Sequence, residues 1–392
     1  MILTKRYERA VDALNQNSID AWLLCGRETN ILGEPGLLYL MPFEAMGRVA
    51  VLITKAGEHL CICGAIESEE AADSGLFNEV VVHRGFEAAI ARELEKRLPI
   101  SRIALDISEN DPSSDGLTHS DYIMLTRCFA AAGFDGEIVS SDCLMKQIRG
   151  RKSVEEVKKI AHTVSEAMKI YEEARPQIRL GLSGRDVQGI FQELIRAKRY
   201  GFSWYEPGNP YVSIGARSSY NCRRPPADVY IEPGDLVNVD LGVRIDGFAS
   251  DNQRSFYALR PDETAPPYEV QHAWETIQRM NREVCAAMRV GVDSNDLTEI
   301  GNQVMVDQGY PEGWQGGYGH ELGLFAHNGG IGAGRGTRQG LDTTLEENMT
   351  FTLEPAILTS HGRLCQEEIV CVTNNGGKML STPQSEIWLI RG

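Results

Sequence analysis

The sequence lacks any uninterrupted apolar run of the length that a signal peptide or a membrane-spanning helix requires. Its first residues, MILTKRYERAVDAL, distribute charged side chains through a helical apolar pattern. We therefore expect a cytoplasmic protein with no membrane partner.

Positive charge is also scarce, because 39 lysines and arginines face 55 acidic residues and leave a formal net charge of -16. Nucleic acids and anionic membranes would repel such a chain at long range. We therefore expect no nucleic-acid partner and favour a small molecule or a short peptide as the substrate.

No pair of cysteines has CxxC spacing, although the chain contains nine cysteines. Cys61 and Cys63 would share one face of a strand. At such positions, buried core thiols are a more common explanation than a metal site or a disulfide bond.

The length of 392 residues favours two domains. Residues 1 to about 145 alternate between helical and strand patterns, which predicts an α/β layer domain. The expected elements are a helix at 5–17, strands at 20–25, 47–53, 59–63 and 102–107, and helices at 86–98 and near 120. A polar, basic segment then precedes Ser153 and Glu156, whose spacing is typical of a capping box that opens a long helix. We predict an N-terminal domain over residues 1–148 and a second domain over residues 149–392.

Two segments of the second half, 178–190 and 288–300, align without a gap at an offset of 110 residues. Each has the sequence pattern of a loop, followed by an N-cap residue (Ser183 or Asp293) and then an amphipathic helix. Two capped helices can look alike by chance, but an internally duplicated domain of two similar α/β halves explains the match better. A site between such halves would draw ligands from both.

The segment DLVNVDLGVRIDGFASDNQRSFY contains two apolar-rich runs around Asp246 and Gly247, a dipeptide that favours a tight hairpin turn. With the turn there, Asp240 faces position 253, and Asp240 and Asp251 lie on one face at a diagonal of roughly 7 Å. Two buried acids on one face would repel each other unless a cation compensates them. The alternative is a solvated face that exposes both carboxylates.

The same pattern recurs in MTFTLEPAILTSHGRLCQEEIVCVT near the C-terminus. With a turn at His361-Gly362, Glu354 and Glu367 lie diagonally on one face, and Glu368 points the other way. A change of one residue in loop length would reverse the choice between Glu367 and Glu368, so parity favours Glu367 only weakly.

A glycine-rich segment between the two hairpins, GGYGHELGLFAHNGG, can bring a histidine close to a ligand. The candidate metal ligands are Asp240, Asp251, His320, Glu354 and Glu367. This oxygen-rich set suits two divalent ions of manganese, iron, cobalt or zinc. Bridging carboxylates hold such ions roughly 3.5 to 4 Å apart, where they activate a water molecule and polarise a substrate carbonyl.

The order Asp, Asp, His, Glu, Glu resembles that of the pita-bread-fold metallopeptidases, which include methionine aminopeptidase, Xaa-Pro aminopeptidase, prolidase and the related creatinase. The matching strings are DLGVRIDGFASDNQRSF, GHELGLFAH, FTLEP and QEEIVCVT. The likeness runs from about residue 150 to the end, and the N-terminal α/β domain resembles that of the prolidase and creatinase branch. It implies an α/β (α+β) protein whose pita-bread domain has two pseudo-symmetric halves.

Carried over by position, the resemblance implies that Asp240 chelates one ion and that Asp251 and Glu367 bridge both. His320 and Glu354 would bind the second ion. Glu354 would also act as a general base or proton shuttle, a role suited to a carboxylate held near two cations.

Four further residues concern the substrate. His327 matches the second histidine of the family's loop and is expected to steady the substrate or the oxyanion, unless it is a structural loop histidine. Arg223 replaces a histidine that the family usually has, and Cys365 stands where Xaa-Pro enzymes have an arginine. Arg223 and Arg224 would hold a substrate carboxylate or else form a solvated turn. We therefore expect intact metal chemistry and an altered substrate pocket.

The leading hypothesis is a two-metal hydrolase that cleaves a peptide-like or small amide C–N bond. One alternative keeps the fold and metals for lyase or hydrolase chemistry on a non-peptide metabolite. Another is a binding module without metal, which the repulsion among four clustered carboxylates disfavours. Related enzymes are often dimers, so the resemblance also implies a homodimer.

Overall fold

The computed structural model describes residues 2–218, 225, 227–312, 317–334 and 341–392. The chain forms two compact units, one built mainly from the residues up to Ser153 and the other from Val154 onward. Within the described ranges, no helix combines the length and apolar character needed to cross a bilayer.

The N-terminal unit is built on a mixed sheet in the order β4-β3-β2-β1-β5-β6. Its strands are β1 (Ala21–Gly26), β2 (Val49–Thr54), β3 (His59–Cys63), β4 (Glu79–Val82), β5 (Arg102–Leu105) and β6 (Glu137–Ser140). Strand β2 runs antiparallel to both β1 and β3, whereas β4, β5 and β6 each join a neighbour in parallel. Every residue of β1 and β2 is buried, which fits a sheet that is covered on both faces.

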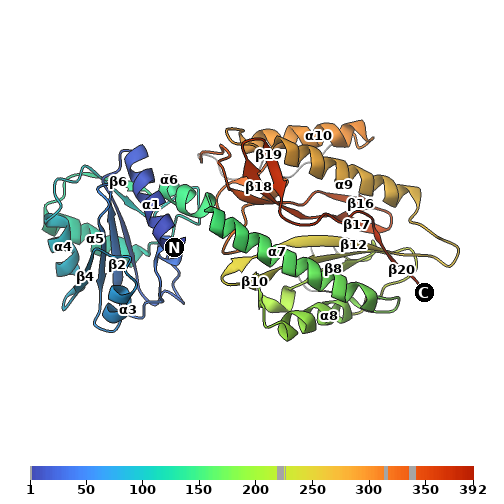
Figure 1. Ribbon diagram of the computed structural model, residues 1–392, viewed down its shortest axis with the longest axis horizontal. Helices are drawn as coiled ribbons and strands as arrows, with labels where there is room; N and C mark the ends of the chain where they lie inside the picture. The colour runs from blue at the N-terminus through green and yellow to red at the C-terminus, as the bar shows by residue number, and fades with distance from the viewer. Residues whose placement is uncertain (1, 219–224, 226, 313–316, 335–340) are drawn as a thin grey trace. The chain divides into compact units, whose positions relative to one another are not determined.

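Helices cover this sheet, as Figure 1 shows on its left-hand side. They are α1 (Ile2–Gln16), α2 (Pro35–Leu40), α3 (Ser68–Asp73), α4 (Phe86–Glu95), α5 (His119–Ala132) and α6 (Asp142–Met145), followed by a π-helical turn at Lys146–Gly150. Ile90 and Leu94 of α4 and Leu125 of α5 share a buried core with Leu52 and Ile62 of the sheet. The predicted α/β layering is confirmed, although α2, α3, α6, β4 and β6 were not expected.

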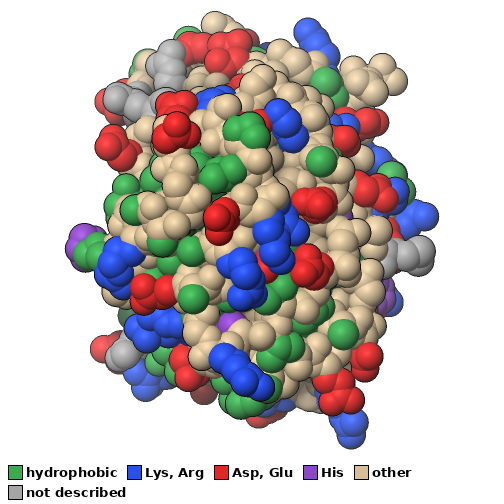
Figure 2. All heavy atoms as spheres, turned by 90° about the vertical axis from the view of Figure 1, so that its left-hand side faces the viewer, with side chains coloured by type: hydrophobic (Ala, Val, Ile, Leu, Met, Phe, Trp, Pro, Cys, Tyr) green, Lys and Arg blue, Asp and Glu red, His purple; other side chains and the backbone are tan. Residues whose placement is uncertain are grey.

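One face of the N-terminal unit is seen in Figure 2, where acidic and basic side chains alternate with apolar ones. The net negative charge of the chain is therefore not gathered into one patch on this face.

The helices of the C-terminal unit occur as two similar pairs: α7 (Val154–Ala174) with α8 (Gly184–Ala197), and α9 (Tyr268–Ala287) with α10 (Leu297–Asp307). The matched glycines before α8 and α10, Gly181 and Gly291, both have positive φ, 78° and 86°. Their N–H groups donate to Ile231 O and Leu345 O, both at 2.9 Å. The same turn is thus built twice, which confirms the predicted duplication.

The strands of this unit form several small sheets, in the orders β20-β12-β9-β8, β11-β10-β7, β15-β18-β19, β13-β14 and β16-β17. The first part of the unit supplies β7 (Gly201–Phe202), β8 (Tyr211–Ile214), β9 (Leu236–Leu241), β10 (Val243–Ile245), β11 (Phe248–Ala249) and β12 (Asn252–Ala258). The remaining strands are β13 (Gly319–His320), β14 (Gly332–Ala333), β15 (Thr350–Leu353), β16 (Ala356–Thr359), β17 (Gly362–Cys365), β18 (Glu368–Thr373), β19 (Gly376–Met379) and β20 (Trp388–Ile390).

Helices α7 and α8 pack on the sheet that contains β9 and β12, while α9 lies beside β16, β17 and β19 (Figure 1). Ile170, Phe191, Val239 and Phe256 belong to the first of these cores. The hydroxyl of Tyr171 on α7 donates to Val239 O at 2.9 Å and to a backbone carbonyl of β12 at 2.7 Å. These two bonds connect α7 to β9 and β12, the strands beside which the candidate site lies.

Candidate metal centre

The first hairpin has the register that the sequence predicts. Asp246 and Gly247 form its turn with φ of 51° and 84°, and Asp240 pairs with Gln253. Asp251 precedes β12 by one residue in the same register, and its oxygen lies near that of Asp240. The aspartates therefore share one face, as expected.

In the second hairpin, the strand pairing is shifted by two residues from the predicted register. Its turn is at Ser360-His361 and not at His361-Gly362, because Thr359 pairs with Gly362. The registers on either side place Glu354 opposite Glu367, so the pair is direct and not diagonal. The two glutamates still share a face, because a shift of two residues preserves the alternation of side chains.

Glu368 points away from this face. Its carboxylate lies 3.1 Å from a guanidinium nitrogen of Arg254, and both side chains are buried. Arg254 Nη1 also donates to the backbone oxygen of Glu367 at 2.9 Å, which holds the neighbouring residue in place.

His320 reaches the carboxylates from β13 because Gly319 allows the backbone to approach β15. A Cβ atom at Gly319 would lie 2.2 Å from Thr352 O. The N–H of His320 donates to Thr352 Oγ1 at 3.1 Å. His320 Nε2 then lies 3.7 Å from Asp251 Oδ2 and 3.5 Å from Glu354 Oε1.

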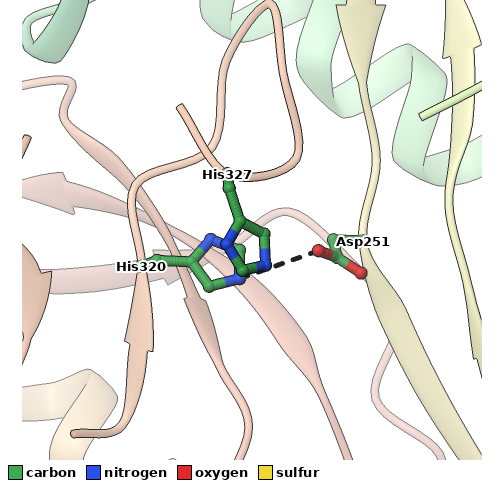
Figure 3. Close-up of side chains that lie close together, drawn as sticks. All are labelled: Asp251, His320 and His327. Carbon is green, nitrogen blue, oxygen red and sulfur yellow. Dashed lines mark ion pairs between the residues drawn. The ribbon is translucent and has the colours of Figure 1, made fainter. Parts of the chain in front are cut away.

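His327 lies beside His320, with ring centroids 3.9 Å apart. The imidazole of His320, from β13, and that of His327, from the loop that follows, are both directed toward Asp251 (Figure 3). Ligand atoms of these three residues lie within 4.8 Å of one another. His327 is exposed, so its ring is accessible to solvent.

The five candidate ligands form one cluster. Within 4.8 Å of one another lie ligand atoms of Asp240, Asp251 and Glu367, and likewise of His320, Glu354 and Glu367. Glu367 thus belongs to both groups, as a bridging ligand would. Arg223 and Arg224, the expected substrate contacts, lie outside the described residues.

The electrostatics of the cluster are those of a site that needs positive charge. Burial, and then the neighbouring Glu354 carboxylate, raise the pKa of Asp240 to about 7. Burial followed by other carboxylates raises the pKa of Asp251 and of Glu367 well above the ordinary range. Among the described residues, neither oxygen of Glu367 nor Oδ1 of Asp240 has a hydrogen-bond partner, although all three are buried. Divalent cations would satisfy these oxygens.

His320 is also suited to a cation. Burial lowers the pKa of its imidazole, which favours the neutral form. A neutral ring has a free nitrogen lone pair, as metal coordination requires. The donor set therefore fits hard divalent cations.

The sequence reasoning missed two residues of the site, Gln253 and Arg363. Gln253 Nε2 donates to Glu354 Oε2 at 3.3 Å, and Arg363 Nη1 donates to Gln253 Oε1 at 2.7 Å. Alternation along the strands offered a signal, since Gln253 faces Asp240 and Arg363 is four residues before Glu367.

A model of metallopeptidase family M24 matches residues 155–375. The chain belongs to the M24 metallopeptidase family. Its membership makes it a metal-dependent hydrolase, and the M24 family uses divalent metals. A similar protein is an Xaa-Pro dipeptidase of Lactobacillus helveticus, 25% identical over 87% of this chain and 88% of that protein.

Solved structures confirm the pita-bread fold of this M24 protein over nearly the whole chain. An Xaa-Pro dipeptidase from Bacillus anthracis has a TM-score of 0.77 at 22% identity, with 99% of this chain and 100% of that chain covered. An X-Pro aminopeptidase from Thermotoga maritima has a TM-score of 0.73 at 22% identity, with 98% and 99% covered.

Proposed function

We propose that this M24 protein is a peptidase for Xaa-Pro dipeptides or similarly short peptides, and that it uses two divalent ions of manganese, iron, cobalt or zinc. The proposed ligands are Asp240, Asp251, His320, Glu354 and Glu367. The observation that carries the proposal is the buried cluster of carboxylates, several of whose oxygens have no hydrogen-bond donor among the described residues. The similarity to an Xaa-Pro dipeptidase of Lactobacillus helveticus supports this substrate class.

Each ligand has a proposed place. Asp240 would chelate one ion, Asp251 and Glu367 would bridge, and His320 and Glu354 would complete the second ion's set. Bound cations supply Lewis acidity, which lowers the pKa of water and polarises the scissile carbonyl.

Glu354 is the proposed general base. Its side chain is 27% exposed, so it can meet water while Gln253 holds one carboxylate oxygen. Water adds to the carbonyl carbon, Glu354 accepts its proton, and the same proton passes to the leaving amine as the C–N bond breaks. His327 would steady the carbonyl oxygen, and Arg223 remains a proposed contact for a substrate carboxylate.

One observation favours a second candidate, cleavage of a non-peptide metabolite by the same centre. Cys365 takes the position at which Xaa-Pro enzymes have an arginine. Its thiol is fully buried and donates to Glu354 O at 3.6 Å, so it offers a substrate carboxylate no positive charge. A substrate without that carboxylate would suit such a pocket.

Removal and return of metal tests the proposal. The protein is stripped with a chelator and supplied in turn with Mn(II), Fe(II), Co(II) or Zn(II). Xaa-Pro dipeptides, small amides and cyclic metabolites are then assayed in parallel. We expect turnover of Xaa-Pro dipeptides only with metal, and a Glu354→Gln variant that keeps its fold without turnover. Turnover confined to the metabolites would transfer the assignment to the second candidate.

We also propose that the protein is a cytoplasmic homodimer. The dimer is supported by the resemblance to a family whose members are often dimers. Light scattering during size-exclusion chromatography measures the mass directly, and a mass of one chain at micromolar concentration would contradict the dimer.

A further inference from the structure

Arg363 occupies a central position beside the carboxylate cluster. Its Nη1 donates to Asn238 Oδ1 at 3.0 Å and to Gln253 Oε1 at 2.7 Å. Asn238 is two residues before Asp240 on β9, and Gln253 is directly across from Asp240 on β12. The guanidinium therefore bridges the two amides that flank the first aspartate.

The chemistry of the guanidinium fixes the orientation of the Gln253 amide. A guanidinium has only donors, so the amide oxygen must face it and the amide nitrogen must face away. That nitrogen donates to Glu354 Oε2 at 3.3 Å. The other carboxylate oxygen, Oε1, is then left on the side of His320, 3.5 Å from Nε2.

We propose that Arg363 and Gln253 form a positioning relay that sets the orientation of the Glu354 carboxylate. The inference rests on the proposed function of Glu354 and makes Arg363 a positioning residue of the reaction. Without the guanidinium, the amide of Gln253 is free to turn its oxygen toward Glu354, which would repel the carboxylate.

The hairpin that carries Arg363 has other anchors. Ser255 Oγ donates to Cys365 O at 2.8 Å, and Asn238 Nδ2 donates to the same oxygen at 3.3 Å. The β16–β17 pairing adds its own backbone bonds. Replacement of Arg363 should therefore disturb the carboxylate before it disturbs the fold.

The kinetic test compares Gln253→Met, Arg363→Met and the double variant, each loaded with Mn(II) and assayed on an Xaa-Pro dipeptide. We expect each single change to lower kcat about tenfold with KM within about twofold. The double variant should be no slower than Arg363→Met, because the arginine acts through the glutamine. Arg363→Lys, which keeps the charge, should recover part of kcat.

A matched control is Arg279→Met, since Arg279 is a partly exposed arginine of α9 paired with Glu283. It should have the parent kcat and KM. Unchanged kcat in both single variants, or losses that multiply in the double variant, would overturn the relay.

A second readout does not depend on turnover. In crystal structures of the metal-free Gln253→Met and Arg363→Met proteins, we expect Glu354 to leave its parent rotamer. A Glu354 side chain that stays in place in both variants would overturn the relay. If the unmodified protein hydrolyses no peptide, the proposed function fails, and these structures still decide whether the relay exists.

Discussion

Glu367 and Glu368 are adjacent residues with opposite electrostatic surroundings. Glu367 faces the carboxylate cluster with both oxygens buried and without a hydrogen-bond partner among the described residues, whereas Glu368 pairs with Arg254. We predict that Glu367→Gln abolishes the rise in melting temperature on addition of Mn(II), because a bridging ligand is lost, while the metal-free protein melts no lower than the parent. Differential scanning fluorimetry measures both quantities.

Glu368→Gln is the matched control for this change. It leaves the Arg254 guanidinium buried without its counter-charge, a loss of about 3–5 kcal/mol. The metal-free protein should therefore melt lower but still respond to Mn(II). If the two variants behaved alike, the assignment of the two faces would be wrong.

The protons of the cluster make the stability of the metal-free protein depend on pH. The pKa of Asp240 is raised to about 7, and burial followed by neighbouring carboxylates also raises the pKa values of Asp251 and Glu367 well above their ordinary range. The folded chain therefore holds protons that the unfolded chain releases from about pH 4, and stability falls as pH rises through this window. We predict a melting temperature that decreases from about pH 5 to about pH 8 in chelator.

Saturating Mn(II) should remove this decrease, because cation binding displaces the protons and stabilises the ionised carboxylates. Calorimetry in two buffers of different ionisation enthalpy would detect the released protons. A melting temperature that rises with pH in chelator would show that the carboxylates are already ionised without metal.

At the scale of elements, β13 reaches β15 only because residue 319 is a glycine. A Cβ atom there would lie 2.2 Å from Thr352 O, so Gly319→Ala must push the strand away and move His320 with it. We predict Mn(II) affinity weakened about tenfold or more, since a histidine ligand is displaced. Isothermal titration calorimetry measures the change.

Gly189→Ala is the matched control, because it makes the same substitution at a position where a Cβ atom meets no neighbour. Gly189 lies within α8, and a Cβ atom there would meet nothing within 4 Å. Alanine should stabilise this helix by about 1 kcal/mol without affecting Mn(II) affinity. Equal Mn(II) affinity in both alanine variants would remove Gly319 from any role at the site.

The two hairpins show how far local sequence determines register. The dipeptide Asp246-Gly247 adopts positive φ at both positions, a conformation that few other pairs favour, and the predicted register was correct. The turn at Ser360-His361 has no comparable signal, and the predicted register was wrong by two residues. The choice of Glu367 over Glu368 survived because an even shift keeps the same face.

Contacts across long sequence separation could not be predicted in the same way. The bond between Arg363 and Gln253 joins residues 110 positions apart, and neither residue type marks a metal site by itself. Trp204 is a second case, because its ring fills the space beside Gly242, where a Cβ atom would lie 2.2 Å from Trp204 Cζ3. Such partners emerge only when the strands are assembled.

At the scale of the whole molecule, the two units have separate cores, one around the β1–β6 sheet and the other around β8, β9 and β12. The proposed metal ligands all lie in the second unit. The domain boundary between residues 148 and 149 stays a prediction, and thermal unfolding can test whether the two units, which divide after Ser153, unfold separately. If each folds by itself, calorimetry should show two transitions, of which Mn(II) raises only one.

Arg149→Met identifies the other transition. Arg149 lies 3.0 Å from Asp111 in a buried ion pair of the N-terminal unit, and loss of the arginine breaks this pair at a cost of about 3–5 kcal/mol. We predict that this change lowers the transition that Mn(II) does not affect and leaves the Mn(II)-dependent one in place. A single transition that Arg149→Met and Mn(II) both shift would mean that the units unfold together. Destabilisation of one core would then also lower the temperature at which the cation site in the other unit unfolds.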